Sequence, residues 1–524
     1  MKSRARHGAL AGALLTAPLI AVSYLGWTFA GLPFAPFDLF DWVARALPGP
    51  IVTAGIDATV AVSRALNVGN MGATAKTAEQ AAAVGGLLLT GVIGGAVLFG
   101  VLRLSDEPAL LLGAILGAIL GGIALVIEQQ LNRIASAPFL SGPWVFVTFL
   151  AWGVALGWVY DRLREAGANS GVGPVDDVED VEGPGRRRFL IQLGGTTITT
   201  TFAATLVGAL SGNRGDGLVG GGRWSDTHSP PNADAAVAPV PGTRPELTSL
   251  EHHYRIDTDT RAPQIDGARW RLKVDGLVER PLALTLDDLR QYEPMHQFVT
   301  LSCISNPAGG DLISTIRWTG VSVRRLLQEM ILNAAATHLR ITSADGFSEV
   351  VAIETIRNDE RIMLAYAWDG VPLLADHGFP LRIYIPDLYG MKQPKWIDTI
   401  VATDRWEPGY WVARGWDRDG HVATTSVVDT VRAGTEAAGG GGLRRVAVGG
   451  IAYAGSRGVS RVNVRVDEGE WQDAQLREPL SGTTWVLWRA DLSVSPGEHV
   501  FAVRAFDGQG RPQAAQFHTR RDRA

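Results

Sequence analysis

Apolar residues crowd the first 160 residues of the chain, in runs that a membrane anchor accommodates and a water-soluble fold does not. Four stretches, at residues 8–32, 82–102, 108–128 and 142–160, are mostly apolar and each close to the length of a membrane-spanning helix. Such a helix needs about 20 apolar residues to cross the hydrocarbon layer of a bilayer. We therefore predict a four-span membrane anchor over residues 1–165.

A more polar segment separates the first two predicted spans. It carries Asp38, Asp41, Arg45, Asp57 and Arg64 among apolar residues. These charges make the segment too polar to cross a bilayer, and the mixed pattern is typical of an amphipathic helix. We predict that residues 38–66 lie on the membrane surface.

The basic residues predict the orientation of the anchor. They precede the first span and follow the fourth, at Lys2, Arg4, Arg6, Arg162 and Arg164. Because Lys and Arg are enriched in cytoplasmic segments, both ends of the four-span block are expected in the cytoplasm.

A second basic cluster, Arg186–Arg188, precedes Phe189 and a Gly- and Thr-rich apolar run that ends at Leu210. This pattern resembles a twin-arginine export signal placed inside the chain. The alternative is a stop-transfer cluster beside an ordinary fifth span. On both interpretations, residues 166–211 contain a cytoplasmic linker, the arginine motif and a fifth span. Both also place the residues after 211 outside the cytoplasm. Residues 212–245, rich in Gly, Pro, Asp and Ser, are predicted to be an extracytoplasmic linker.

Charge and cysteine content exclude several classes of protein. A net charge of −5 leaves no basic face for nucleic acid. A single cysteine, Cys303, rules out an intramolecular disulfide and the paired spacings of zinc, c-type haem and iron–sulfur sites. The predicted spans contain no histidine, the usual haem ligand inside a membrane. We expect neither haem nor flavin in this chain.

The second half of the chain has the pattern of a soluble protein. Between residues 246 and 425, strand-like segments such as 269–278 alternate with helical ones at 284–292 and 321–330. Beyond residue 426, apolar alternation between Gly, Asp and Pro turns predicts strands alone. We predict a multidomain fold with an α-helical membrane anchor, an α+β domain over residues 246–425, and an all-β immunoglobulin-like sandwich over residues 426–524.

Cys303 ends a β-type stretch and is followed by Ser-Asn and Gly-Gly, where a loop can aim a side chain into a site. A thiolate is a soft metal ligand, and cations nearby, such as Arg317, favour its deprotonation. The alternative for a lone cysteine is a small buried apolar side chain.

Four basic residues lie close together downstream, among aromatic residues and Gly and Pro turns: His377, Arg382, Lys392 and Lys395. Fixed cationic donors beside exposed backbone N–H groups suit a phosphate-bearing ligand. The alternative for each residue alone is a solvated surface charge. Their concentration in one stretch favours the ligand.

With these motifs, residues 246–524 resemble the sulfite oxidase family of molybdopterin enzymes, which includes assimilatory nitrate reductases. The resemblance rests on the C-x-x-N segment at Cys303, the DHGFP-x-R segment, and the G-x-K-x-x-K-W segment. It implies that Cys303 binds molybdenum and that the catalytic domain is of the sulfite oxidase type. It also implies that the cofactor is molybdenum-molybdopterin, held by His377, Arg382, Lys392 and Lys395.

The resemblance assigns further residues. Tyr254 and Asp345 are expected to contact the pterin, and Arg255 to face the substrate. Tyr410 is the candidate active-site tyrosine. Asp257 stands where the family has a histidine, which puts pterin contacts at that position in doubt. The C-terminal sandwich is similar to the family's dimerisation domain and implies a homodimer.

Two departures bear on the substrate. Ala308 occupies a position where sulfite-oxidising members have an arginine, and the C-terminal Asn-x-Arg-Gly segment of the family is missing. A doubly charged oxyanion in a dry pocket needs such cations.

The resemblance therefore implies a membrane-anchored, extracytoplasmic oxidoreductase that transfers an oxygen atom to or from a small substrate, with a sulfite-like oxyanion as one candidate. Electrons are expected to pass to a separate partner, a cytochrome or a quinone-linked membrane protein. One alternative is a sulfoxide or other oxide reductase with the same site. Another is a non-catalytic, membrane-anchored binding module of the same fold.

Overall fold

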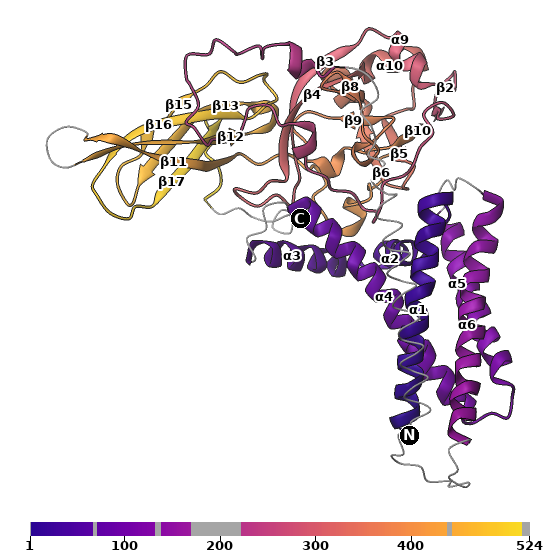
Figure 1. Cartoon of the computed structure of the whole chain (residues 1–524). Coiled ribbons are helices and arrows are strands. Elements are labelled where there is room, and N and C mark those ends of the chain that lie inside the picture. Colours follow the sequence, from indigo (N-terminus) through magenta and orange to yellow (C-terminus); the bar gives the residue numbers. More distant parts are fainter. Residues whose placement is uncertain (1, 66–70, 132–137, 169–221, 438–442, 516–524) are drawn as a thin grey trace. The chain divides into compact units, whose positions relative to one another are not determined.

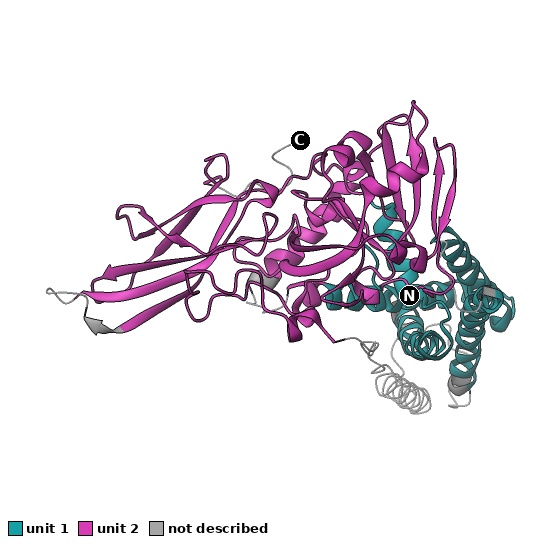
Figure 2. Ribbon diagram, turned by 90° about the horizontal axis from the view of Figure 1, so that it is seen from above, with its two compact units in different colours: residues 1–47, 76–217, 258–261 teal, residues 48–75, 218–257, 262–524 magenta. Residues whose placement is uncertain are grey.

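The computed structural model describes residues 2–65, 71–131, 138–168, 222–437 and 443–515. The described residues form two compact units, coloured separately in Figure 2. The first contains residues 1–47, 76–217 and 258–261, and the second contains residues 48–75, 218–257 and 262–524. Two short segments belong to a different unit from their neighbours in the sequence: residues 48–75 belong with the soluble half, and residues 258–261 belong with the N-terminal helices.

Four of the N-terminal helices coincide with the predicted spans (Figure 1). They are long and apolar enough to cross a membrane, and they are α1 (Lys2–Ala30), α4 (Met71–Leu102), α5 (Ala109–Leu131) and α6 (Pro138–Ala168). The predicted fifth span and the arginine cluster at residues 186–188 lie outside the described residues.

Glycines spaced four residues apart allow these helices to pack closely. A Cβ at Gly113 of α5 would lie 2.3 Å from the carbonyl oxygen of Gly153, and one at Gly153 of α6 would lie 2.2 Å from that of Gly113. Small residues at such spacing let membrane helices approach backbone to backbone, where van der Waals contacts hold them together.

The predicted amphipathic segment forms two helices, α2 (Ala35–Ala46) and α3 (Gly49–Ala65), which belong to different units. Asp38 and Asp41 of α2 are buried, which differs from a predicted position on the membrane surface. Asp41 accepts hydrogen bonds from the backbone N–H and hydroxyl of Thr260, at 2.9 and 3.0 Å. The carboxylates of α2 therefore hold the segment 258–261.

The α+β domain contains two sheets. One has the strand order β2-β1-β10-β5-β6, in which β1 and β10 are parallel, and the other has the order β3-β4-β7-β8, with β9 paired to β7. The strands of the first sheet are β1 (Leu272–Gly276), β2 (Leu282–Leu284), β5 (His338–Ser343), β6 (Ser348–Ala352) and β10 (Ile397–Thr403). The strands of the second are β3 (Met295–Ser302), β4 (Ile313–Ser322), β7 (Met363–Trp368), β8 (Val371–Pro372) and β9 (Arg382–Tyr384).

Three short α-helices accompany these sheets, and two of them confirm predictions: α9 (Leu286–Gln291), α10 (Val323–Met330) and α11 (Ile353–Asn358). Helix α9 begins at a capping box, because the Asp288 backbone N–H donates to the Thr285 hydroxyl and the Thr285 backbone N–H donates to the Asp288 carboxylate. One apolar core joins the helices to the first sheet and contains the fully buried Leu272, Leu326 and Ile400. The core also contains Ile383 of β9, the strand that begins at the site residue Arg382.

As predicted, the described residues of the C-terminal part form β-strands and no α-helix. One sheet has the order β11-β12-β16-β15 and the other has the order β14-β13-β17. The strands are β11 (Thr425–Ala437), β12 (Arg444–Tyr453), β13 (Val459–Val466), β14 (Gln472–Asp473), β15 (Gln475–Leu476), β16 (Val486–Val494) and β17 (Phe501–Asp507). Val448, Val462 and Trp488 are buried between the sheets, so the domain is a sandwich. Its immunoglobulin-like character stays a prediction.

The predicted linker at residues 212–245 requires a correction for its described part, residues 222–245. Val240 is buried, and Asn232 donates a hydrogen bond to the carbonyl of Glu478 at 2.6 Å. The buried Arg477 pairs with Glu246 at 2.9 Å and donates to three carbonyl groups of residues 232–237. Polar composition suggested a free linker, but one arginine organises these backbone groups against the sandwich.

We expect Arg477→Met to release this segment, because removing the guanidinium takes the charged partner from Glu246, which keeps a hydrogen bond from Asn232, and takes the donor from three carbonyl groups. Breaking a buried ion pair costs about 3–5 kcal/mol. Limited proteolysis should then cut within residues 232–246, and the melting temperature of the soluble half should fall. Arg489→Met, which removes a more exposed pair with Asp491, should leave both measurements unchanged. Equal behaviour of the two variants would contradict this account.

Candidate active site

Cys303 directly follows strand β3, whose last four residues are buried. The loop after it is fixed by its own backbone, because Cys303 N–H donates to Leu312 at 2.9 Å and Asn306 N–H donates to the Cys303 carbonyl at 3.0 Å. The Asn306 side chain accepts from Leu312 N–H at 2.9 Å. A Cβ at Gly310 would lie 2.5 Å from that side-chain oxygen. The predicted loop is thus confirmed, and it holds the thiol rigidly at the strand end.

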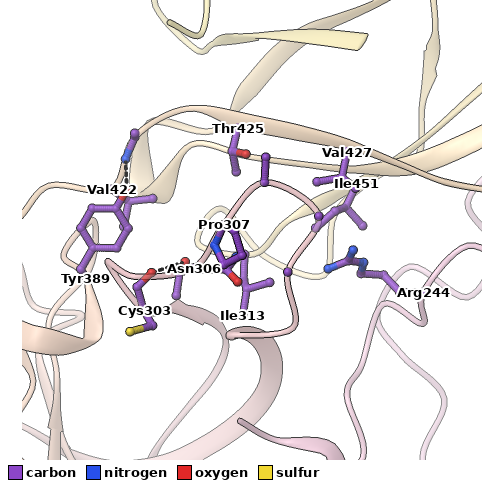
Figure 3. A pocket seen from close by; sticks show the side chains of 15 residues that line it. Arg244, Cys303, Asn306, Pro307, Ile313, Tyr389, Val422, Thr425, Val427 and Ile451 are labelled. Atoms are coloured by element: carbon purple, nitrogen blue, oxygen red, sulfur yellow. Dashed lines mark hydrogen bonds between the residues drawn. The ribbon is translucent and has the colours of Figure 1, made fainter. Parts of the chain in front are cut away.

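A small pocket, partly open to solvent, lies beside this loop (Figure 3). The Cys303 loop forms one wall, with Ala308 and Gly309 at its tip, and Tyr389, Val427 and Ile451 contribute to the remainder. Arg244 also lines the pocket, but its guanidinium is paired with Asp429 at 2.6 Å. The pocket therefore offers little uncompensated positive charge near Ala308.

The side chains packed around Cys303 are mostly apolar. Cys303, Leu312 and Met71 form one buried cluster, against which Tyr254 packs. Burial, and then the neighbouring Cys303, raise the pKa of the Tyr254 hydroxyl well above its ordinary value. Tyr254 therefore stays protonated at neutral pH and can act as a hydrogen-bond donor next to the thiol.

Two of the predicted cations are buried near Tyr254. Arg382, at the start of β9, donates to the His377 carbonyl at 3.0 Å and lies 4.6 Å from the Trp318 ring centroid. Burial lowers the pKa of Arg382 to about 10 and that of Lys395 to about 8. Among the described residues Arg382 has no ion pair, and Lys395 has Asp257 at a long 3.4 Å. Positive charge is therefore concentrated here in a place that is largely shielded from water, with the Lys395 side chain 11% exposed.

Two histidines lie against these cations. The ring centroids of His253 and His377 are 5.2 Å apart, and Ser314 contacts Nδ1 of His253 at 2.6 Å. Burial, and then the positive charges of neighbouring groups, hold the pKa of both imidazoles well below the ordinary value. Both rings are therefore neutral at pH 7, and each can donate one hydrogen bond and accept another.

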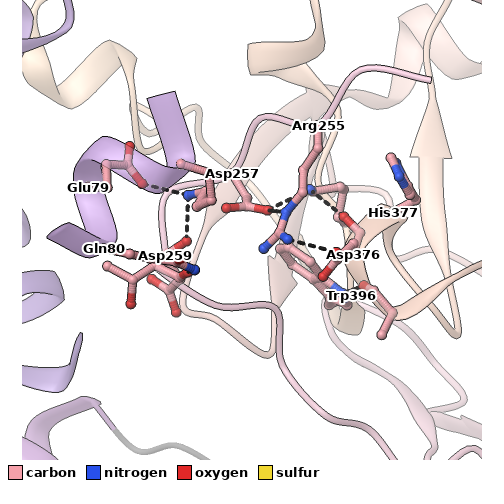
Figure 4. Close-up of polar contacts among 12 residues, drawn as sticks. Glu79, Gln80, Arg255, Asp257, Asp259, Asp376, His377 and Trp396 are labelled. Atoms are coloured by element: carbon pink, nitrogen blue, oxygen red, sulfur yellow. Dashed lines mark hydrogen bonds and ion pairs between the residues drawn. The ribbon is translucent and has the colours of Figure 1, made fainter. Parts of the chain in front are cut away.

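Arg255 reaches the same cluster through two carboxylates (Figure 4). Its Nε donates to Asp257 at 2.8 Å, and its Nη1 lies 2.7 Å from Asp376. Asp257 also pairs with Lys395, so one buried carboxylate joins the two basic side chains. The aspartate that replaces the family histidine thus acts as a counter-ion within the cluster.

The remaining predicted residues divide into two groups. Asp345 is buried in the turn between β5 and β6, and its charge acts to raise the pKa of Lys395. Lys392, by contrast, pairs at 2.8 Å with Glu349, which is fully buried. Tyr410 stacks on Phe347 and lies under the Arg414 guanidinium, 3.7 Å from ring centroid to Cζ. The structure therefore gathers Tyr254, His377, Arg382 and Lys395 into one cluster. The contacts of Lys392 and Tyr410 are with residues outside this cluster.

Sequence reasoning missed three residues of this region. His253 precedes the predicted Tyr254 and could have been found as the second histidine of the HHYR segment. Glu349, the buried partner of Lys392, lies in an ordinary strand pattern. Met71 lies more than 200 positions before Cys303 and gave no local signal.

The donor set fits an anionic metal cofactor. A buried thiol stands near two desolvated cations and two neutral histidines, and Gly378 and Gly390 keep the surrounding backbone open. A Cβ at Gly378 would lie 3.2 Å from the Cβ atoms of Arg382 and Lys395. Burying cations in this way is costly unless an anion compensates them. These residues suit a protein that binds a soft metal together with a phosphate-bearing organic group.

Comparison with known proteins indicates which organic group such a domain binds. Residues 259–411 match the family model described as an oxidoreductase molybdopterin binding domain. A nitrate reductase (NAD(P)H) of Hordeum vulgare is 27% identical over 330 residues, covering 50% of this chain and 36% of that protein. The putative protein-methionine-sulfoxide reductase subunit YedZ1 of Azospira oryzae is 28% identical over 246 residues, covering 45% of this chain and 88% of that protein.

The sulfane dehydrogenase SoxCD from Paracoccus pantotrophus is a similar solved structure, with a TM-score of 0.42 and 21% identity. The match covers 48% of this chain and 71% of that one. The chain spans about a third of the length of the nitrate reductases that it matches. Residues 259–411 are thus an oxidoreductase molybdopterin binding domain, in agreement with the resemblance to the sulfite oxidase family. The domain implies a molybdenum-molybdopterin cofactor.

We expect the cofactor-free protein to lose stability as the pH falls below the ordinary histidine pKa. The pKa values of His253 and His377 are lowered on folding, so below about pH 6.5 the unfolded chain binds protons that the folded chain does not. Each histidine then costs about 1.4 kcal/mol per pH unit until its folded pKa is reached.

Melting temperature measured between pH 7.5 and 5 checks this expectation. His377→Gln should flatten the decline, whereas His252→Gln, which changes an exposed neighbour, should leave it as in the parent protein. A decline that His377→Gln does not alter would contradict the assignment of His377 as a buried neutral histidine.

Proposed function

We propose that the chain is a membrane-anchored molybdenum-pterin oxidoreductase that transfers an oxygen atom to or from a small substrate on the extracytoplasmic side. The observation that carries the proposal is the buried positive charge of Arg382 and Lys395 near the Cys303 thiol, inside a domain of a molybdopterin-dependent family. The four apolar helices support the membrane anchor.

We assign the following roles. Cys303 would hold the molybdenum through its thiolate, and Arg382 and Lys395 would bind the phosphate of the pterin. Tyr254, His253 and His377 would orient the pterin by hydrogen bonds, with Asp345 contributing from the β5–β6 turn. When bound, the cofactor supplies two-electron oxygen-atom transfer.

The protein residues would bind the substrate and manage its protons. Arg255 is the predicted substrate-facing arginine, and its pairing with Asp257 and Asp376 would set the direction of its guanidinium. Tyr410 is the predicted hydrogen-bond donor to the substrate. Lys392 is predicted to bind the pterin, which would require its amine to bridge Glu349 and the ligand.

Two directions of turnover suit such a site. Oxidation of sulfite takes an oxygen atom from water and releases two electrons and two protons. Reduction of a sulfoxide consumes two electrons and two protons and releases the oxygen as water. The reductive direction is favoured by Ala308 at the pocket, which offers no cation for a doubly charged oxyanion. It is also favoured by the similarity to a protein named as a sulfoxide reductase subunit.

In either direction a separate electron carrier is needed, and we propose a cytochrome or a quinone-linked membrane protein. Expected features that remain predictions are the absence of haem and flavin, the homodimer, and export through the segment at residues 186–210.

Replacement of Cys303 tests the cofactor assignment. The full-length protein, purified in detergent from a host that makes and exports the cofactor, should contain about one molybdenum and one pterin per chain. Cys303→Ser should lower turnover by at least about 100-fold, because a metal ligand is lost. Ser305→Ala, two residues along the same loop, should behave as the parent protein. Normal turnover by Cys303→Ser, or a folded parent protein without molybdenum and pterin, would exclude the proposed function.

Introduction of a cation at the pocket tests the direction. Ala308→Arg should lower the KM for sulfite by about tenfold, since a charge-assisted contact is worth about 1.5–3 kcal/mol. The KM for a neutral sulfoxide should change little. If Ala308→Arg leaves the KM for sulfite unchanged, the missing cation is not what limits oxyanion binding.

A further inference from the structure

Helix α3 packs one of its faces onto the loops around the site. Thr53 is 4% exposed and accepts a hydrogen bond from Nε1 of Trp416 at 3.2 Å. Ile56 packs into the aromatic cluster that contains Trp411 and Trp416. One turn further on, Val60 packs against the cluster of Cys303 and Leu312. This inner face therefore runs from the Trp-rich loop to the thiol.

The start of helix α4 continues the contact. Met71 is 8% exposed and belongs to the same buried cluster as Cys303 and Leu312. Its N–H donates to Asp311 at 2.8 Å. A Cβ at Gly72 would lie 2.9 Å from the carbonyl oxygen of Arg255, so the backbones meet closely there. Residues from the N-terminal part of the chain thus form a wall of the Cys303 site.

The opposite face of α3 is apolar and exposed. Ile51 and Val62 are 54% and 56% exposed. The exposed apolar residues recur at intervals of three or four, which places them on one side of the helix: Ile51, Ala54, Gly55, Ala58, Ala61, Val62 and Ala65. The exposed Asp57 lies at the edge of this side. Among the side chains of α3 that the structure describes, Asp57 is the one charged group. Water is a poor solvent for such a stripe.

The neighbouring helices indicate what covers this stripe. Helix α4, which begins at Met71, is itself long and apolar enough to cross a membrane. Five residues join α3 to α4, and an extended chain of that length reaches at most about 18 Å. The apolar stripe of α3 is therefore tethered within a short distance of a span.

We propose that α3 is an interfacial helix whose outer apolar stripe contacts the surface of the bilayer. Its inner face, together with Met71, closes one side of the Cys303 site. The partner of the stripe is the lipid surface. The site is then served by substrates and redox partners that reach it along the membrane. This inference rests on the proposed membrane anchoring, and the experiments separate the two.

Photo-crosslinking tests the lipid contact. The full chain is reconstituted in phosphatidylcholine vesicles that contain an alkyne-tagged lipid, with Ala58 replaced by p-benzoylphenylalanine. The same replacement is made at Ile119, on the exposed face of α5, and at Ala268, on an exposed turn of the soluble half. Lipid adducts are expected at positions 58 and 119 and not at position 268.

Each other pattern has a definite meaning. Adducts at 119 without adducts at 58 would overturn the interfacial helix and leave the anchor intact. Absence of lipid adducts at 119 would overturn the anchor itself. Adducts from position 58 to a second copy of the chain, or to another protein, would replace the lipid by that partner.

The single cysteine provides a direct test of the wall. In cofactor-free protein, Met71→Ala should increase the rate at which a maleimide reagent labels Cys303 by about tenfold or more, because local opening then exposes the thiol. Met295→Ala, a half-buried methionine of another cluster, is the matched control and should leave the rate unchanged. Equal labelling rates in the parent protein and Met71→Ala would overturn the wall.

Discussion

The soluble half holds positive charge in a largely buried place, and this constraint bears on the rest of the site. Arg382 and Lys395 are held by strand β9 and its neighbouring loops, away from water, and burial depresses the pKa of both groups. Asp257 compensates part of this charge through Lys395 and Arg255. A folded domain tolerates the remainder at a cost, and an anion that binds there recovers it. Burial of these cations therefore lowers the stability of the cofactor-free protein and raises its affinity for an anionic cofactor.

The same constraint explains why so much apolar and aromatic structure surrounds the cluster. His253 packs between Tyr254, Trp318 and Trp368, all within 6 Å by ring centroid. Rigid rings exclude water and hold the imidazole in one orientation, which preorganises donors and acceptors for a planar ligand. On the other side, the thiol is fixed by the backbone of its loop and covered by Met71.

Much of this could be read from the sequence, because it is local. The four spans follow from apolar run length, helices α9 and α10 from their periodicity, and the position of Cys303 from a strand followed by a Gly-rich turn. The assignment of residues 48–75 and 258–261 to units other than those of their sequence neighbours could not be read from the sequence, because it depends on contacts between distant segments. The pairing of Lys392 with Glu349 and the packing of residues 222–245 through Arg477 are of the same kind. Their partners lie 43 or more positions away, with no shared motif.

The wall formed by α3 and Met71 has a consequence for the order of assembly. Its residues precede the arginine cluster at 186–188, whereas Cys303 follows it, so the two parts of one site are joined through the anchor. If the catalytic domain crosses the membrane already folded around its cofactor, as an export signal of this kind implies, it does so without that wall. On that route the site would remain open during loading and would be closed by α3 and Met71 upon arrival. A chain that fails to cross would keep its cofactor exposed on one side, and the anchor would distinguish delivered molecules from undelivered ones.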